Sequence, residues 1–138
     1  MEPILTRCGN RCDLCLAYKP NVESHPELRP ALSDGWFRYF GFRTPPEEIY
    51  CEGCMEPHPR LLDTECPVRP CVLEKKLENC SECDQYVCDR LRQRLVVLEE
   101  LKKKIGAEIP AEDYRRFIHP YENFIRLEEL RGRGEPRE

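Results

Sequence analysis

Ten cysteines stand in close-spaced groups along this chain of 138 residues. Three of the spacings are C-x-x-C pairs, in which two thiolates can converge on one metal ion while the intervening backbone N–H groups bond the sulfurs. One such pair is a weak sign, whereas three make metal binding the leading hypothesis. The ten candidate ligands are Cys8, Cys12, Cys15, Cys51, Cys54, Cys66, Cys71, Cys80, Cys83 and Cys88.

The middle cysteines form the most self-contained set. Cys51, Cys54, Cys66 and Cys71 have the pattern C-x2-C-x11-C-x4-C, which can close a tetrahedral four-thiolate shell typical of structural zinc. The six outer cysteines lie three at each end, so a second four-thiolate site needs ligands from both ends and leaves two cysteines over. Spacing does not decide which two. With one ion in each four-thiolate site, we expect two zinc ions.

Other chemistries stay open at this point. An iron–sulfur cluster for electron transfer or redox sensing also suits the close thiolates Cys8, Cys12 and Cys15, and Cys66 is followed by Pro67. The first spacing is also that of radical S-adenosylmethionine enzymes, but this chain is too short for their barrel and shows almost no strand pattern. A thiol- or metal-handling enzyme or carrier, with spare cysteines as nucleophiles or exchangeable ligands, is a further alternative.

Composition and charge limit the cellular location and the kinds of partner expected for this protein. Residues 1–7 lack the basic and apolar regions of a signal peptide, and no apolar run approaches the roughly 18 residues of a membrane span. We therefore expect a cytoplasmic protein with reduced thiols, not a disulfide scaffold. A net charge of −4 disfavours nucleic acid and acidic membranes as partners. No catalytic constellation is present, so an enzyme is not favoured.

The fold expected is mainly α with irregular metal-binding loops. With 35% charged residues and 13 prolines the apolar core is thin, so metal–thiolate bonds would supply much of the folding free energy. We predict a single domain over 1–138. It comprises a small cysteine-rich, zinc-knuckle-like core at 1–90, a C-terminal helical hairpin at 91–130 and a flexible tail at 131–138.

The elements that would position the cysteines are short. A turn is expected at Cys8-Gly9-Asn10, where glycine allows positive φ. Capping-box spacing at Ser24 and Glu27 predicts a helix that runs to about Phe40, and Thr44 to Glu47 predicts a helical turn before Cys51. The prolines at 57, 59, 67 and 70 argue against long elements before Val72, and a short helix follows at 72–77.

The C-terminal part is expected to form the hairpin. Leucines recur at helical spacing from Leu91 to Ile105, which predicts one amphipathic helix ended by Gly106. A second helical stretch from Pro110 to Leu127 would pack back on it, interrupted at Pro120. The hairpin, or the basic face of its first helix, is where we expect a protein partner to bind.

The remaining candidates are weaker. With so many thiolates nearby, His58 is expected to be a loop residue and not a ligand, His25 lies in a first helical turn, and His119 is expected to pack among aromatic residues. The aromatic residues from Trp36 to Phe42 could stack on a ligand, but their spacing fits a buried helix face better. The basic residues 90–94 and 102–104 are better explained as solvated helix faces.

Four motifs in order resemble a known family, the cysteine-rich domain of unknown function 3795 of bacteria and archaea. The resemblance runs from Cys8 to about Leu91 and implies a stand-alone, prokaryotic, cytosolic protein, but it names no activity. The motifs are Cys8-Gly9-x-x-Cys12-x-x-Cys15-x-x-Tyr18, Cys51-x-Gly53-Cys54, Cys66-x-x-Arg69-x-Cys71 and Asn79-Cys80-x-x-Cys83-x-x-x-x-Cys88.

Overall fold

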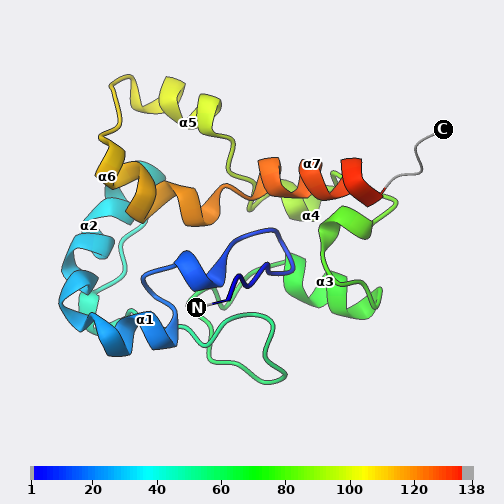
Figure 1. Cartoon of the computed structure of the whole chain (residues 1–138), viewed down its shortest axis with the longest axis horizontal. Coiled ribbons are helices and arrows are strands. Elements are labelled where there is room, and N and C mark those ends of the chain that lie inside the picture. The colour runs from blue at the N-terminus through cyan, green and yellow to red at the C-terminus, as the bar shows by residue number, and fades with distance from the viewer. Residues whose placement is uncertain (1, 135–138) are drawn as a thin grey trace.

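The computed structural model describes residues 2–134, which fold into short helices joined by long irregular loops (Figure 1). No β-strand forms within this range, only two isolated bridges, Leu5 with Arg11 and Tyr18 with Cys51. The predicted mainly helical fold is confirmed. The α-helices are α1 (Lys19–Ser24), α2 (Arg29–Phe40), α3 (Val68–Glu74), α4 (Asp89–Arg92), α5 (Leu98–Ile105), α6 (Ala111–Asp113) and α7 (Asn123–Gly134).

Helix α2 ends where the sequence predicts but begins later. Gly41 has φ 81° and donates its N–H to the carbonyls of Trp36 and Phe37, which ends the helix after Phe40. At its other end, Ser24 closes α1, and a 3-10 turn at Pro26–Leu28 intervenes. His25 leaves the helical region (φ −139°, ψ 64°) because the proline ring disfavours helical geometry in the preceding residue.

The predicted single helix from Leu91 to Ile105 is wrong, because the chain leaves helical geometry between α4 and α5. The side chain of Asn123, which is fully buried, explains the break. Its Oδ1 accepts the N–H of Val96 at 2.8 Å, and its Nδ2 donates to the carbonyl of Arg94 at 2.9 Å. These bonds replace helical hydrogen bonds that the segment gives up. Gly106, with φ 71°, then ends α5 as predicted.

Helix α3 begins at Val68, four residues before the predicted start. Pro70 falls in its first turn, where the missing N–H has no helical partner to lose, so the prolines do not delay the helix. The earlier start places Cys71 on a helix instead of a loop. The predicted turn before Cys51 forms as a 3-10 turn at Pro46–Glu48.

The chain reverses after α5, and the returning arm is broken as expected (Figure 1). After α6 it forms a π turn at Tyr114–Ile118 and a 3-10 turn at His119–Tyr121, which contains Pro120. Helix α7 then continues through Gly134, beyond the predicted end at residue 130. Arg131, assigned to the flexible tail from sequence, donates to the carbonyls of Ser81 and Cys83. Residues 135–138 of that tail lie outside the described residues.

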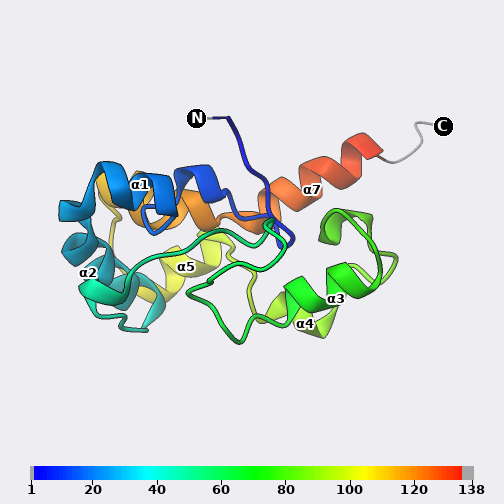
Figure 2. The same cartoon turned by 90° about the horizontal axis from the view of Figure 1, so that it is seen from below.

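The helices gather at two ends of the molecule, with the irregular N-terminal segment and the long loop before α3 between them (Figures 1 and 2). The α2 end contains α1, α2 and α5, and the α3 end contains α3, α4 and α7. The core of the α2 end is Ala17, Leu32, Trp36, Tyr39, Ile49, Leu101, Phe117 and Ile118. The buried cluster of the α3 end is Cys8, Val68, Val72, Cys80, Leu91 and Leu127. Cysteines thus replace part of the apolar core at the α3 end.

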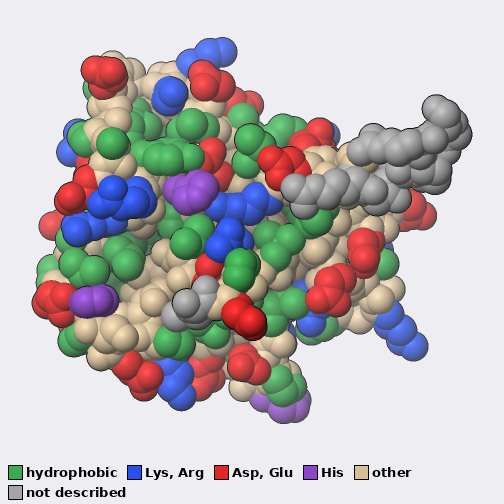
Figure 3. Space-filling model, viewed as in Figure 1, with side chains coloured by type: hydrophobic (Ala, Val, Ile, Leu, Met, Phe, Trp, Pro, Cys, Tyr) green, Lys and Arg blue, Asp and Glu red, His purple; other side chains and the backbone are tan. Residues whose placement is uncertain are grey.

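The surface mixes charges of both signs. On the face shown in Figure 3, Lys and Arg side chains alternate with Asp and Glu. Arg92 of the predicted basic helix pairs with Asp89, and Arg94 pairs with Asp63 at 2.6 Å, so these residues form ion pairs and not a bare basic patch. None of the helices in the described part of the chain is both long and apolar enough to cross a bilayer.

Candidate functional site

The ten cysteines carry free thiols and divide between two hollows of very different size. The first, which we name the six-cysteine cavity, has a volume of about 750 Å³. The second, the four-cysteine pocket, has a volume of about 10 Å³, close to that of one water-sized sphere. The cavity is lined by Cys8, Cys12, Cys15, Cys51, Cys54 and Cys66, and the pocket by Cys71, Cys80, Cys83 and Cys88.

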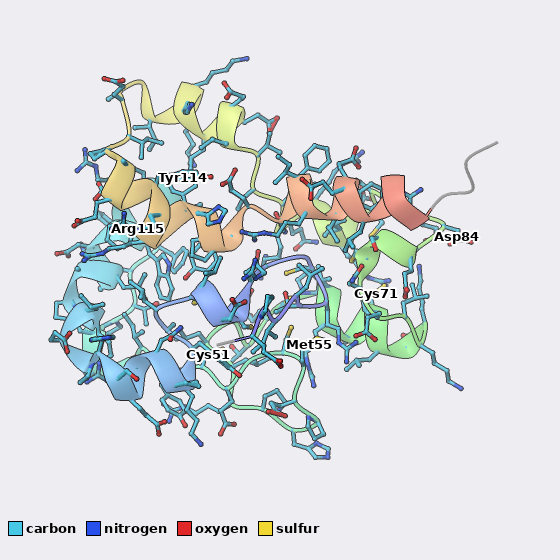
Figure 4. The ribbon with its side chains drawn as sticks, in the orientation of Figure 1. Cys51, Met55, Cys71, Asp84, Tyr114 and Arg115 are labelled. Atoms are coloured by element: carbon cyan, nitrogen blue, oxygen red, sulfur yellow. The ribbon has the colours of Figure 1, made fainter. Side chains whose placement is uncertain are left out.

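This division separates the four middle cysteines that the spacing groups into one shell. Cys51, Cys54 and Cys66 line the cavity, whereas Cys71 lines the pocket. Figure 4 shows Cys51 on the loop beneath the N-terminal segment and Cys71 on α3, toward the other side of the molecule. The outer cysteines are divided as well, since the N-terminal three line the cavity and the C-terminal three line the pocket.

A backbone bridge brings two C-x-x-C pairs together in the cavity. Cys51 donates its N–H to the carbonyl of Ala17 at 2.8 Å and accepts the N–H of Lys19 at 2.7 Å. The pair Cys51 and Cys54 therefore lies beside the 3-10 turn at Cys12–Leu14 and Cys15. Asn21 holds this turn, because its side-chain amide donates to the carbonyl of Cys15 at 2.8 Å.

Two glycines shape the loops that carry these thiols. Gly9 follows Cys8 with φ 95°, as the sequence predicts, and Gly53 precedes Cys54 with φ 90°. A side chain at Gly53 would also crowd Tyr18, whose ring lies 3.1 Å from the position of a Cβ. Both turns thus favour glycine for its conformation and for its close packing, since a Cβ at Gly9 would lie 2.9 Å from Leu127 Cγ.

Backbone N–H groups are directed at the sulfurs of the cavity. The backbone N–H groups of Ala17 and Tyr18 lower the pKa of the Cys15 thiol, and that of Asn10 lowers the pKa of the Cys8 thiol, against the larger effect of burial. The Tyr121 hydroxyl also lies 2.9 Å from Cys15 Sγ. Donors two and three residues after a cysteine stabilise a thiolate in the way that metal-binding turns do.

The metal-free thiols of the cavity are held in the protonated form. Burial raises the pKa of Cys8 and of Cys15 to about 11, because removal from water disfavours the charged thiolate. Burial also raises the pKa of Cys12, and the neighbouring thiols of Cys54, Cys15 and Cys51 raise it further. Metal binding at this cavity must therefore displace protons to solvent.

The four-cysteine pocket is built from a short stretch of chain. Cys71 lies on α3, Cys80 begins the 3-10 turn at Cys80–Glu82, Cys83 follows that turn, and Cys88 immediately precedes α4. The turn is capped by Asn79, whose Oδ1 accepts the N–H of Ser81 at 2.9 Å. It is tied to the N-terminal segment because the Cys80 N–H donates to the carbonyl of Arg7 at 2.9 Å.

Cations reach the sulfurs of the pocket. Lys75 Nζ donates to Cys83 Sγ at 3.1 Å, and Arg90 Nη1 donates to Cys71 Sγ at 3.3 Å. The N–H of Gln85 also points at Cys83 Sγ, at 3.4 Å. Burial raises the pKa of Cys80 to about 12. The pocket thus combines a buried thiol with exposed cations that can compensate thiolate charge.

Comparison with known proteins places the chain in a family. A family model described as Protein of unknown function (DUF3795) matches residues 4–93. The chain belongs to the DUF3795 family. The matched range contains every cysteine of both hollows and ends directly after α4, so α5, α6 and α7 lie beyond the part that DUF3795 defines. No curated protein and no solved structure matches the chain.

The cavity extends past the DUF3795 region. Tyr121, which contacts Cys15, lies 106 residues from it in sequence, and Leu95 and Val96 line the same cavity. Trp36, Phe40 and Phe42 of the predicted aromatic helix face form another part of the wall. Spacing gave no signal for Tyr121 or for the cations Lys75 and Arg90, because their contacts with sulfur depend on tertiary packing.

The histidines lie away from both hollows. His25 and His58 are exposed, and His25 lies 3.2 Å from the Glu27 carboxylate. His119 contacts the Tyr114 hydroxyl and Glu122, each at 3.2 Å. The expectation that none of the three is a metal ligand stays a prediction.

The thiols surround the two hollows without closing on a common point. Across residues 2–134, no group of three or more His, Cys, Asp or Glu side chains is arranged so that it could hold a metal ion as it stands. The zinc-knuckle core of the predicted fold is therefore a proposal and not an observation. What the DUF3795 region supplies is a set of soft sulfur donors, several already hydrogen-bonded, around two preformed spaces.

Proposed function

We propose that this protein binds zinc through cysteine thiolates and serves as a metal-stabilised interaction module. The observation that carries the proposal is the division of the cysteines, which places two C-x-x-C pairs across the bridge of Tyr18 and Cys51 and a third pair in the other hollow. Each hollow then has at least four soft donors, as tetrahedral zinc requires.

The ligand sets differ from those predicted by spacing. Cys12, Cys15, Cys51 and Cys54 would hold one ion in the cavity, with two ligands from each side of the backbone bridge. Cys71, Cys80, Cys83 and Cys88 would hold another in the pocket. Zinc needs its sulfurs at about 2.3 Å, so binding would rotate the cysteine side chains inward. When bound, the ions would cross-link loops that have little apolar core of their own.

A role in binding a protein partner fits the surface as well. Phe37, Phe42 and Ile125 expose 52%, 48% and 56% of their surface, although each is a large apolar residue. Exposed apolar side chains such as these are available for contact with a partner. The module would then be held in shape by its metal ions while other residues make the contact.

The first experiment is elemental analysis with an absorption spectrum on the whole chain purified without oxygen. The proposal expects at least two zinc ions per chain and no visible absorbance. Cys15→Ser should lower the zinc content by disrupting the cavity, and Cys83→Ser by disrupting the pocket, whereas His58→Ala should leave it unchanged.

Two results would overturn the proposal. Protein with intact thiols and no bound metal would show that the cysteines serve another purpose. Iron with inorganic sulfide and a broad visible band would assign the cavity to an iron–sulfur cluster instead of zinc.

A further inference from the structure

Four aromatic side chains that line the six-cysteine cavity lie close to one another. The ring centroids of Trp36 and Phe42 are 5.3 Å apart, and those of Trp36 and Tyr121 are 6.3 Å apart. Phe40 lies 6.4 Å from Phe42 and 6.1 Å from Tyr121. Separations of about 4.5–7 Å are those of interacting rings. We name Trp36, Phe40, Phe42 and Tyr121 the aromatic wall, and none of them is a ligand of the proposed zinc site.

The aromatic wall extends from the protein surface to the thiols. Phe42 is 48% exposed, whereas Trp36 is 5% exposed. At the inner end, the Tyr121 hydroxyl lies 2.9 Å from Cys15 Sγ. The cavity volume of about 750 Å³ is far larger than one metal ion and falls within the range of about 300–1,000 Å³ that is typical of pockets for small organic molecules. Space therefore remains beside the wall when the thiols hold zinc.

Two polar atoms at this cavity are buried without a hydrogen-bond partner among residues 2–134. They are the donor Arg7 Nε and the acceptor Asn10 Oδ1, and both residues line the cavity. Buried polar groups in native proteins are nearly always paired, with protein, with ordered water or with another bound group. The cavity is thus a space whose contents complete hydrogen bonds, and not a dry void.

The charged residues that line the cavity are mostly cationic, although the whole chain has a net charge of −4. Among the described lining residues the cations are Arg7, Arg11, Arg69, Arg94 and Lys104, and the carboxylate is Asp63. Arg94 holds Asp63, at 2.6 Å between Nε and Oδ2. Within this described lining, no carboxylate is left to attract a cationic ligand, so the potential of the cavity favours an anion.

Most of these cations already have a partner. Arg11 pairs with Asp13 at 2.6 Å. Arg69 donates its Nε to the carbonyl of Cys54 at 2.8 Å, so its charge lies beside a proposed zinc ligand and offsets thiolate charge. Lys104 differs, because it lines the cavity and forms no ion pair within residues 2–134.

Lys104 lies at the same end of the molecule as the aromatic wall. It belongs to α5, which packs through Leu101 and Ile105 against the core that contains Trp36. The lysine is exposed, so its ammonium group stands at the mouth of the cavity and not inside it. A cation beside an apolar wall matches a molecule that has an apolar body and one acid group.

We propose that the six-cysteine cavity binds a small organic anion, with its flat apolar body against the aromatic wall and its acid group at Lys104. Aromatic rings supply a large contact area for such a body, and the ammonium group selects for the acid. Binding is non-covalent and needs no open position on zinc. This role goes beyond metal binding, and the two are tested on the same sample.

The probe is 2-naphthoate, compared with 2-naphthamide, which has the same rings and no charge. Isothermal titration of the full chain should show one naphthoate per chain, bound about 10-fold more tightly than the amide. Trp36 is the only tryptophan in the sequence, so its indole N–H gives a single NMR resonance, which naphthoate should shift. Zinc content of the same sample reports on the proposed metal site separately.

Two pairs of exposed residues provide matched variants that leave the core intact. Phe42→Ala should raise the Kd for naphthoate about 10-fold, because part of the aromatic wall is lost. Phe37→Ala, at a ring that is 52% exposed and outside the lining, should leave the Kd unchanged. Lys104→Gln should abolish the preference for the acid over the amide. Lys103→Gln, at a neighbouring residue of α5 outside the lining, should retain it.

The outcomes separate this inference from the zinc proposal. Equal affinity for acid and amide, or a Lys104→Gln variant that keeps the preference, would overturn the anion site. A zinc-loaded chain that binds no naphthoate would overturn it as well, while the proposed function stands. Selective naphthoate binding by a chain without zinc would support the anion site and overturn the metal proposal.

Discussion

The two hollows show how cysteines can be arranged in opposite ways within one small chain. The four-cysteine pocket takes its donors from residues 71–88, has space for about one water-sized sphere, and places Lys75 and Arg90 on its sulfurs. The six-cysteine cavity takes donors from residues 8–66, is far larger, and surrounds its sulfurs with backbone N–H groups and hydroxyls. The pocket takes its thiols from one short stretch of chain, whereas the cavity joins distant segments and has more thiols and more space than one ion requires.

The difference extends to the apolar core beside each hollow. The α2 end has aromatic and aliphatic residues from α2, α5 and the π turn, with Tyr39 and Phe117 stacked at 6.4 Å between ring centroids. The α3 end has a buried cluster in which Cys8 and Cys80 take the place of apolar residues. Hydrophobic burial can therefore hold the α2 end, while the α3 end has less apolar core and would depend more on the proposed zinc.

Metal removal should give the largest difference in stability between the two ends. A structural zinc site contributes about 10–16 kcal/mol in small peptides, which is as large as the whole stability of a typical domain. Chelation should abolish hydrogen-exchange protection over residues 68–92, which include α3 and α4, and leave much of the protection of α2. Exchange measured by mass spectrometry on the full chain checks this. Equal loss at both ends would show that the α2 end has no independent core.

Phe117→Ala should be the largest single change at the α2 end. The ring is 7% exposed and packs against Tyr39 and Gly35, so its loss leaves a cavity and should lower the free energy of unfolding by about 3–5 kcal/mol. Phe37→Ala, at a ring that is 52% exposed, is the control and should change it by less than about 1 kcal/mol. Urea unfolding of the metal-loaded variants measures both. Similar changes in the free energy of unfolding for the two variants would mean that the aromatic core does not stabilise the α2 end.

Asn123→Leu should have a smaller effect, at the point where the two ends meet. The substitution leaves the Val96 N–H and the Arg94 carbonyl without their partner, at a cost of about 1–3 kcal/mol for a buried group. Gln93→Ala, at an exposed neighbouring residue, is the control. The midpoints of thermal unfolding of the two variants measure this effect. An unchanged midpoint for Asn123→Leu would show that the break between α4 and α5 has another cause.

The smallest effect is expected from the cations at the four-cysteine pocket. Arg90→Met removes the donor to Cys71 Sγ, so zinc at the pocket should be lost about 10-fold more readily. Arg92→Met on the same helix is the matched control, since Arg92 pairs with Asp89 and not with a sulfur. Transfer of zinc to a coloured chelator reports the rate, and the cavity is the internal reference. If the cavity loses zinc faster as well, the cation acts on overall stability and not on the pocket.

Local sequence signals predicted much of the fold. The chain ends α2 at Gly41 and α5 at Gly106, turns at Gly9, and breaks near Pro120, because glycine and proline act through their own backbone geometry. The predicted start of α2 at Ser24 was too early, because Pro26 disfavours helical geometry in the preceding residue. The predicted start of α3 at Val72 was too late, because Pro70 is tolerated in the first turn of a helix.

The grouping of the thiols was beyond the reach of spacing. Sequence distance suggests that Cys66 and Cys71 share a site, yet α3 carries Cys71 into the pocket while Cys66 stays at the cavity. The C-x-x-C turns themselves were visible, since each is formed by adjacent residues. Which turns face one another depends on the hydrogen bonds between Cys51 and the backbone of Ala17 and Lys19.

The sequence by itself determined the chemistry of this protein: the number of soft donors, the tight turns that present them, and membership of the DUF3795 family over residues 4–93. These follow from residue type and from contacts between near neighbours. Only the tertiary structure decided how the donors are divided and what surrounds them. Asn123 splits a helix that is 27 residues away, and Tyr121 reaches the Cys15 sulfur across 106 residues. Such contacts form only when the whole chain packs, so no local pattern encodes them.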